Sequence, residues 1–97
     1  MDLEQALTTL RRHSADIRSL GASHLFLFGS VAKNQARPDS DVDLFFDFEA
    51  PDFSIVELVA ISERISALLE HPADVISRGS IHPRLRASIE TSAIQVF

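Results

Sequence analysis

The chain has 97 residues, of which 45% are hydrophobic and 24% are charged, and its formal net charge is −5. This composition is typical of a folded protein, and we expect a single domain over residues 1–97. The negative charge disfavours direct binding of nucleic acid, and no apolar run reaches the ~18 residues needed to cross a membrane. The lack of cysteine excludes disulfides and thiolate chemistry. Because the N-terminus lacks the basic region of a signal peptide, we expect a cytoplasmic protein.

The first forty residues predict a helix, a strand and a short helix. Apolar residues over 3–20 are spaced as one face of a helix, and Gly21 follows as a stop signal. The apolar run 25–28 is too short for a helix and is typical of a strand buried on both faces. This strand ends at Gly29-Ser30, and residues 31–40 begin as a short helix and finish with turn residues.

The middle of the chain predicts a second strand and a long helix. Apolar and polar residues alternate over 41–48 with the period of two that is typical of a strand. Ser54 is a suitable N-cap for the helix, and Glu57 stands three residues later as its capping-box partner. The helix should extend to about residue 70 along an apolar stripe that we expect to make core or dimer contacts, formed by Ile55, Leu58, Val59, Ile65, Leu68 and Leu69.

The last quarter of the chain predicts a third strand over 73–76 and a helix that begins at His82-Pro83, with Leu85 and Ile89 as its apolar positions. Residues 93–97 suit either a terminal strand or a frayed tail. The order of these elements predicts an α/β (α+β) fold, in which helices flank a small mixed β-sheet.

Two aspartates, Asp41 and Asp43, are the most informative feature of the sequence. Two positions apart on a strand, their carboxylates project from one face, about 6 to 7 Å apart at the backbone. At an effective dielectric constant near 20, such charges repel each other by about 2 to 3 kcal/mol. Mg²⁺ or Mn²⁺ would relieve this repulsion, because these cations prefer carboxylate oxygens. Asp74, at the start of the next strand, would complete a two-metal site and could accept a proton from a hydroxyl group.

The Gly29-Ser30 turn supplies a complementary feature. Glycine lets a phosphate approach the backbone closely, free amides at a helix start attract anions, and the serine hydroxyl adds a donor. Together with the aspartates, this turn predicts a site in which metal ions hold a triphosphate whose far end the turn orients. An EF-hand calcium loop is a weaker alternative, because Leu44 stands where that loop requires glycine and Ala50 where it requires glutamate.

The remaining polar residues favour structural roles. We expect Asp39 to belong to a turn and Asp47 to be solvated on its strand. The four histidines lack the spacing of metal ligands. A solvated helix face is a better interpretation than a contact with nucleotide or partner for Arg78, Arg84 and Arg86.

From about residue 25 to the C-terminus, the sequence resembles the minimal nucleotidyltransferases of the DNA polymerase β superfamily. That family has the motif Gly-Ser-x-Ala-Arg-Gly, then Ser-Asp-x-Asp-Leu, then a third aspartate on a later strand. The corresponding residues are 29–34 (Gly-Ser-Val-Ala-Lys-Asn), 40–44 (Ser-Asp-Val-Asp-Leu) and Asp74. Lys33 and Asn34 depart from the motif, although lysine keeps the charge and asparagine tolerates a left-handed backbone.

The resemblance implies the polymerase β-like fold and an enzyme that transfers AMP from ATP with release of pyrophosphate. It assigns binding of the β- and γ-phosphates to Gly29 and Ser30, with Lys33 as a further phosphate contact. It implies two magnesium ions, or manganese in their place, and it makes Asp74 the group that activates the acceptor hydroxyl. The implied metal-binding and catalytic set is Asp41, Asp43 and Asp74.

The resemblance also implies a protein partner. Larger family members use another domain to cover the nucleotide, so here a partner or a second copy of the chain should supply that wall. Small members typically act as antitoxins that transfer AMP to a tyrosine of a HEPN-domain ribonuclease toxin. Two alternatives stay open, namely transfer to a small molecule such as an aminoglycoside with the help of a separate acceptor domain, and a non-catalytic antitoxin that acts by occlusion.

Overall fold

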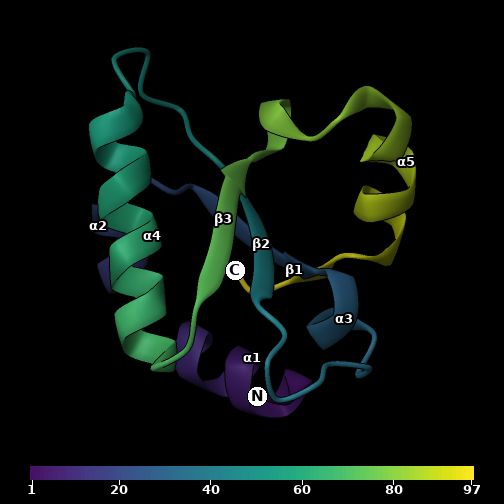
Figure 1. Ribbon diagram of the computed structural model, residues 1–97. Helices are drawn as coiled ribbons and strands as arrows, with labels where there is room; N and C mark the ends of the chain where they lie inside the picture. Colours follow the sequence, from purple (N-terminus) through teal and green to yellow (C-terminus); the bar gives the residue numbers. More distant parts are fainter.

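The computed structural model describes residues 1–97 and contains a four-stranded sheet with the order β3-β2-β1-β4 (Figure 1). Strand β1 (His24–Phe28) pairs antiparallel with β2 (Val42–Asp47) and with β4 (Ile94–Gln95). Strands β2 and β3 (Ala73–Ser77) are parallel. The prediction of a small mixed sheet is confirmed, and the end of the chain forms an edge strand rather than a frayed tail.

Helices α1 (Leu3–Arg12), α2 (Ser14–Ser19) and α4 (Ile55–Leu69) cover one face of the sheet, where the hydrophobic core lies. Alternate residues of the strands point into this core, as a half-buried strand requires. None of the helices has the length and apolar character needed to cross a membrane. The core includes the buried side chains of Leu10, Ile17, Leu25, Leu27, Val42, Leu44, Phe46, Ile61 and Ile65.

The expected single helix over 3–20 is wrong, because the chain forms two helices separated at His13. This residue has φ −106° and ψ 21°, which is outside helical geometry. Leu10 and Ile17 are nevertheless both fully buried. They are seven residues apart and so share one helix face, and for this reason a one-residue interruption leaves the apolar periodicity intact.

The N-terminus of α4 is confirmed at Ser54, whose amide donates a hydrogen bond to Glu57 and whose hydroxyl accepts one from the amide of Val56. Only part of the apolar stripe expected for this helix makes core contacts. The first core residue of α4 is Ile61, whereas Ile55 in the first turn is 67% exposed. The first turns of α4 therefore present apolar side chains to solvent.

We expected strand β1 to be buried on both faces, and this expectation is wrong. The strand has one buried and one half-buried face. On the half-buried face, Phe26 stacks on Phe45 of β2 with ring centroids 4.7 Å apart. The guanidinium of Arg78 lies over both rings, 4.7 and 4.9 Å from their centroids. This cation covers aromatic surface in place of an apolar helix.

Arg78 lies in a short 3₁₀ turn (Arg78–Ser80) and connects the sheet to α5 (Pro83–Ser92). Its Nε and Nη2 donate to the two carboxylate oxygens of Asp47 at 2.7 and 3.0 Å, and its Nη1 donates to Glu90. The hydrogen bond from Arg78 lowers the pKa of the Glu90 carboxyl group. The expectations of a solvated Arg78 and a solvated Asp47 are therefore wrong. The sequence did not reveal this pairing because Arg78 and Asp47 are 31 residues apart.

We expect Arg78→Gln to lower the free energy of unfolding by about 1–2 kcal/mol, because it leaves Asp47 and Glu90 without their shared cation in a partly exposed position. Helix α5 contains no buried residue, so its amide hydrogens should also exchange faster. Thermal melts and hydrogen exchange measure the two effects. Arg84→Gln removes an exposed arginine of α5 and is the control. Equal effects of the two substitutions would contradict this role of Arg78.

Candidate active site

Two of the three candidate aspartates are neighbours on adjacent strands. In the parallel register of β2 and β3, Asp43 lies opposite Asp74, so both side chains project from the same face with their Cα atoms about 4.8 Å apart. Asp41 directly precedes β2. Asp43 is half-buried, whereas Asp41 and Asp74 are exposed. The structure thus brings the three acidic residues to one end of the β2–β3 pair.

The electrostatics of this end of the sheet favour a cation. Burial raises the pKa of the Asp43 carboxyl group, and the negative charges of Asp74 and then Asp41 raise it further. As placed in the structure, no three His, Asp or Glu side chains form a set that could hold a metal ion. Asp41 and Asp74 are exposed, so their side chains can rotate without disturbing the core. The donor set, three carboxylates that repel one another, fits a hard divalent cation.

The Gly29-Ser30 turn lies against the carboxylate of Asp43. Phe28 is the register partner of Asp43, and α3 (Gly29–Ala32) begins directly after Phe28. Gly29 has φ +74°, and a Cβ atom added there would lie 2.4 Å from Oδ2 of Asp43. Only glycine fits this position, for both conformational and steric reasons. The candidate phosphate turn and the acidic residues therefore belong to one site.

The two residues that depart from the family motif end α3. The amide of Lys33 donates a hydrogen bond to the carbonyl of Gly29 at 3.1 Å, and the side chain of Lys33 is exposed. Asn34 has φ +56°, the left-handed backbone that asparagine tolerates. The chain thus keeps the turn that the motif glycine would form, and it keeps a cation at its surface.

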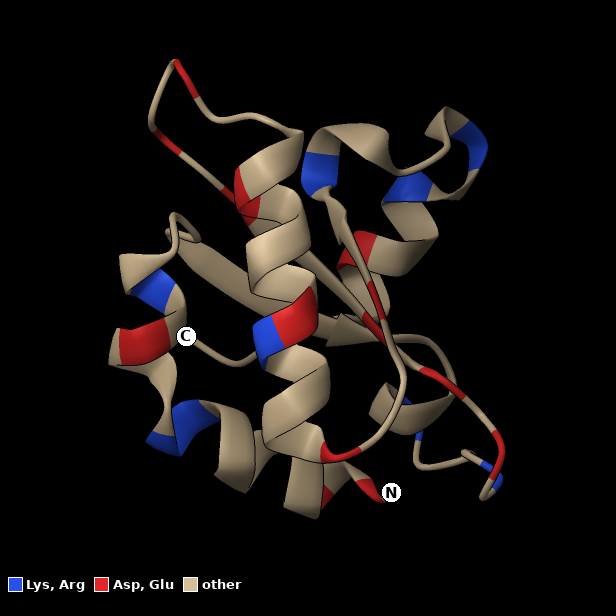
Figure 2. Ribbon diagram, turned by 60° about the vertical axis from the view of Figure 1, so that its left-hand side comes forward, with Lys and Arg blue, Asp and Glu red and all other residues tan.

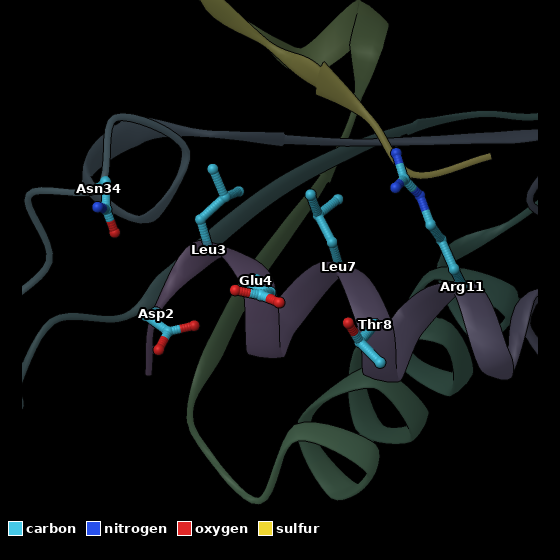
Figure 3. Close-up of a pocket in the computed structure, with 7 residues that line it drawn as sticks. All are labelled: Asp2, Leu3, Glu4, Leu7, Thr8, Arg11 and Asn34. Atoms are coloured by element: carbon cyan, nitrogen blue, oxygen red, sulfur yellow. The ribbon is translucent and has the colours of Figure 1, made fainter.

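The site is open, without a pocket of its own. The largest surface hollow, about 440 Å³, lies between α1 and the turn after α3 and is lined by Asp2, Glu4, Arg11 and Asn34, among others (Figure 3). None of the three candidate aspartates lines this hollow or any of the other three. Asp41 and Asp74 therefore face solvent, and the half-buried Asp43 lies with them at the N-terminal end of β2 and β3.

An aromatic surface borders the acidic site and was not predicted as part of it. Phe45 follows Asp43 by two residues on the same sheet face, and the rings of Phe28 and Phe26 pack against it. The signal was present in the sequence, because Phe45 is the one apolar residue in the outward-facing set of the alternating strand. Phe28 and Asp43 are register partners, so this aromatic surface reaches the acidic site.

Comparisons with known proteins show the family of this chain. The model of the nucleotidyltransferase domain family matches residues 10–96. The protein adenylyltransferase MntA of Thermococcus cleftensis is 27% identical over 97 residues, which cover 99% of this chain and 97% of that protein.

Solved structures share the fold. A protein provisionally assigned as a minimal nucleotidyltransferase matches with a TM-score of 0.76 and 35% identity, over 97% of this chain and 95% of that one. A chain from the complex of a tri-AMPylated Shewanella oneidensis HEPN toxin with its MNT antitoxin matches with a TM-score of 0.66 and 15% identity, over 94% and 71%. The second likeness is one of fold alone. With residues 10–96 matched by the family model, the chain belongs to the nucleotidyltransferase domain family, the class of enzyme that its motifs predicted.

Proposed function

We propose that the chain is a metal-dependent protein adenylyltransferase that transfers AMP from ATP to a tyrosine of a HEPN-domain toxin and thereby acts as its antitoxin. The observation that carries this function is the position of Asp43, which lies beside Asp74 on one side and against Gly29 on the other. The names of similar proteins support it, since one is a protein adenylyltransferase and one structure contains an AMPylated HEPN toxin with an MNT antitoxin.

Asp41, Asp43 and Asp74 would hold Mg²⁺, for which Mn²⁺ could substitute. Burial raises the pKa of the Asp43 carboxyl group, and the negative charges of Asp74 and Asp41 raise it further; a divalent cation would relieve this crowding of negative charge. When bound, the metal ions would neutralise the negative charge of the triphosphate and of the attacking oxygen. The carboxylates would hold these ions at the N-terminal end of β2 and β3, where the nucleotide would lie.

The turn after β1 would hold the far end of the nucleotide. The amide of Gly29 and the hydroxyl of Ser30 would donate to the β- and γ-phosphates, and Lys33 would add a positive charge. The acceptor oxygen attacks the α-phosphorus while Asp74 takes its proton. The bond from the α-phosphorus to the bridging oxygen breaks, and pyrophosphate leaves.

The open site suits an acceptor presented by another protein. Since no surface hollow includes the aspartates, the chain provides no pocket for a small acceptor. A tyrosine on a flexible segment can reach an open edge. The partner, or a second copy of the chain in a larger assembly, would supply the wall that covers the nucleotide.

The direct test is incubation with labelled ATP, Mg²⁺ and the HEPN-domain protein encoded beside this chain. We expect label on the partner, and Asp43→Asn should reduce the rate by about 100-fold or more, since a lost metal ligand costs several kcal/mol of transition-state stabilisation. Glu4→Gln removes an exposed carboxylate on α1 and should retain activity. Label on a small molecule would instead indicate the aminoglycoside type of transfer. Neutralisation of the toxin by Asp43→Asn without any label would indicate occlusion.

We expect Gly29→Ala to lower the free energy of unfolding by about 1–3 kcal/mol and to weaken ATP binding, because the added Cβ displaces the Asp43 carboxylate and strains a left-handed residue. Gly79→Ala is the matched control, since a Cβ at that position meets no atom within 4 Å. Thermal melts with and without ATP measure both effects. Wild-type melting of Gly29→Ala would show that the turn and the carboxylate are not in contact.

A further inference from the structure

The beginning of α4 and the loop before it carry four of the five large apolar side chains that are exposed in this protein. Val56 is 70% exposed, Ile55 67%, Val59 46% and Phe48 44%. We call these four residues the α4 patch. Outside it, the single exposed large apolar side chain is Leu85 on α5. Scattered apolar residues are normal on a protein surface, but a contiguous group of them marks an interaction site.

The α4 patch borders a preformed apolar hollow of about 250 Å³, lined in part by Phe48, Phe53 and Leu58. The rings of Phe48 and Phe53 are stacked, with centroids 4.3 Å apart and planes within 14°. Phe53 also packs on the buried Phe46. One wall of the hollow is therefore held in place by the core, and its size suits an apolar side chain from outside.

The charged residues of the segment that carries the α4 patch are all negative. Residues 48–63 include Glu49, Asp52, Glu57 and Glu63 but no lysine or arginine. Figure 2 shows this acidic character along the loop before α4 and at the start of the helix. Arg78, beside the hollow, is already bound to Asp47 and Glu90. An apolar surface with this rim complements apolar side chains flanked by lysine or arginine.

A second copy of the chain does not complement this surface. In a two-fold interface the same patch lies on both sides, so two acidic rims would face each other. We propose that the α4 patch docks the HEPN-domain partner, through an apolar surface bordered by Lys and Arg; this rests on the function proposed above.

The position of the patch would leave the active site free. Phe48 follows the C-terminal end of β2, whereas Asp43 lies near its N-terminal end, five residues or about 16 Å away along the strand. Three of the four patch residues belong to α4, which packs on the core face of the sheet, while Asp43 and Phe45 point to the other face. In Figure 1 the loop before α4 and helix α3 lie at opposite ends of the sheet. A docked partner could thus present a flexible acceptor segment to an uncovered site.

The test measures the Kd of this chain for the HEPN-domain protein encoded beside it, by calorimetry. Val56→Glu should raise the Kd at least about tenfold, because it buries a carboxylate in the apolar part of the contact. The Lys and Arg residues at the border of the contact would not fully compensate this cost. Leu85→Glu is the matched apolar-to-acid change on α5 and should stay within about twofold of the wild type. Asp52→Asn should weaken the salt dependence of binding, since it removes part of the acidic rim. Both glutamate variants change exposed residues, and their melting temperatures verify that they fold.

The proposed docking is overturned if the wild type does not bind this partner, if Val56→Glu binds as the wild type does, or if Leu85→Glu weakens binding equally. A homodimer that Val56→Glu dissociates would overturn it as well, since a second copy would then occupy the patch. Parallel AMP-labelling reactions separate the two proposals. If the partner is labelled but Val56→Glu does not change the Kd, only the docking proposal is contradicted. If Val56→Glu raises the Kd but the partner is never labelled, only the enzymatic function is contradicted.

Discussion

The contact between the Asp43 carboxylate and Gly29 is the constraint on which the site depends. It exists because the β1–β2 register sets Phe28 opposite Asp43, so the turn after β1 closes directly over the acidic residue. A slip of one residue in that register would send Asp43 into the core face and Leu44 to the open face. The hydrophobic alternation of β2 therefore fixes the chemistry of its outward side chains as firmly as it fixes the core.

The two faces of the sheet have different tasks. Helices α1, α2 and α4 close one face and supply the hydrophobic stability of the protein. On the other face, the guanidinium of Arg78 lies over the half-buried Phe26 and the buried Phe45, and its ion pair with Glu90 joins helix α5 to the sheet. No further layer of helices covers the acidic end of this face, so a nucleotide could reach it. The α4 patch at the far end of β2 would let a partner protein bind without blocking access of the nucleotide to the acidic residues.

Local signals in the sequence were sufficient for most of the fold. The capping residues at Ser54, the period of two after Asp41 and the Gly29-Ser30 turn each depend on neighbours in sequence, and the structure has all three elements. Features that depend on distant partners could not be predicted. Periodicity identifies the apolar face of α4 but does not separate the residues that reach the core from those that stay exposed, such as Ile55. The pairing of Arg78 likewise exists only after the sheet and α5 have come together.

The central claim is that the acidic residues bind divalent cations beside the Gly29-Ser30 turn. The most direct measurement is an NMR titration of the chain with Mn²⁺ and a non-hydrolysable ATP analogue, because the paramagnetic ion broadens the signals of nearby amides. We expect broadening centred on residues 29–30, 41–43 and Asp74, and its loss in Asp43→Asn. Broadening centred instead on the hollow at α1, or broadening that leaves Asp74 untouched, would contradict the claim.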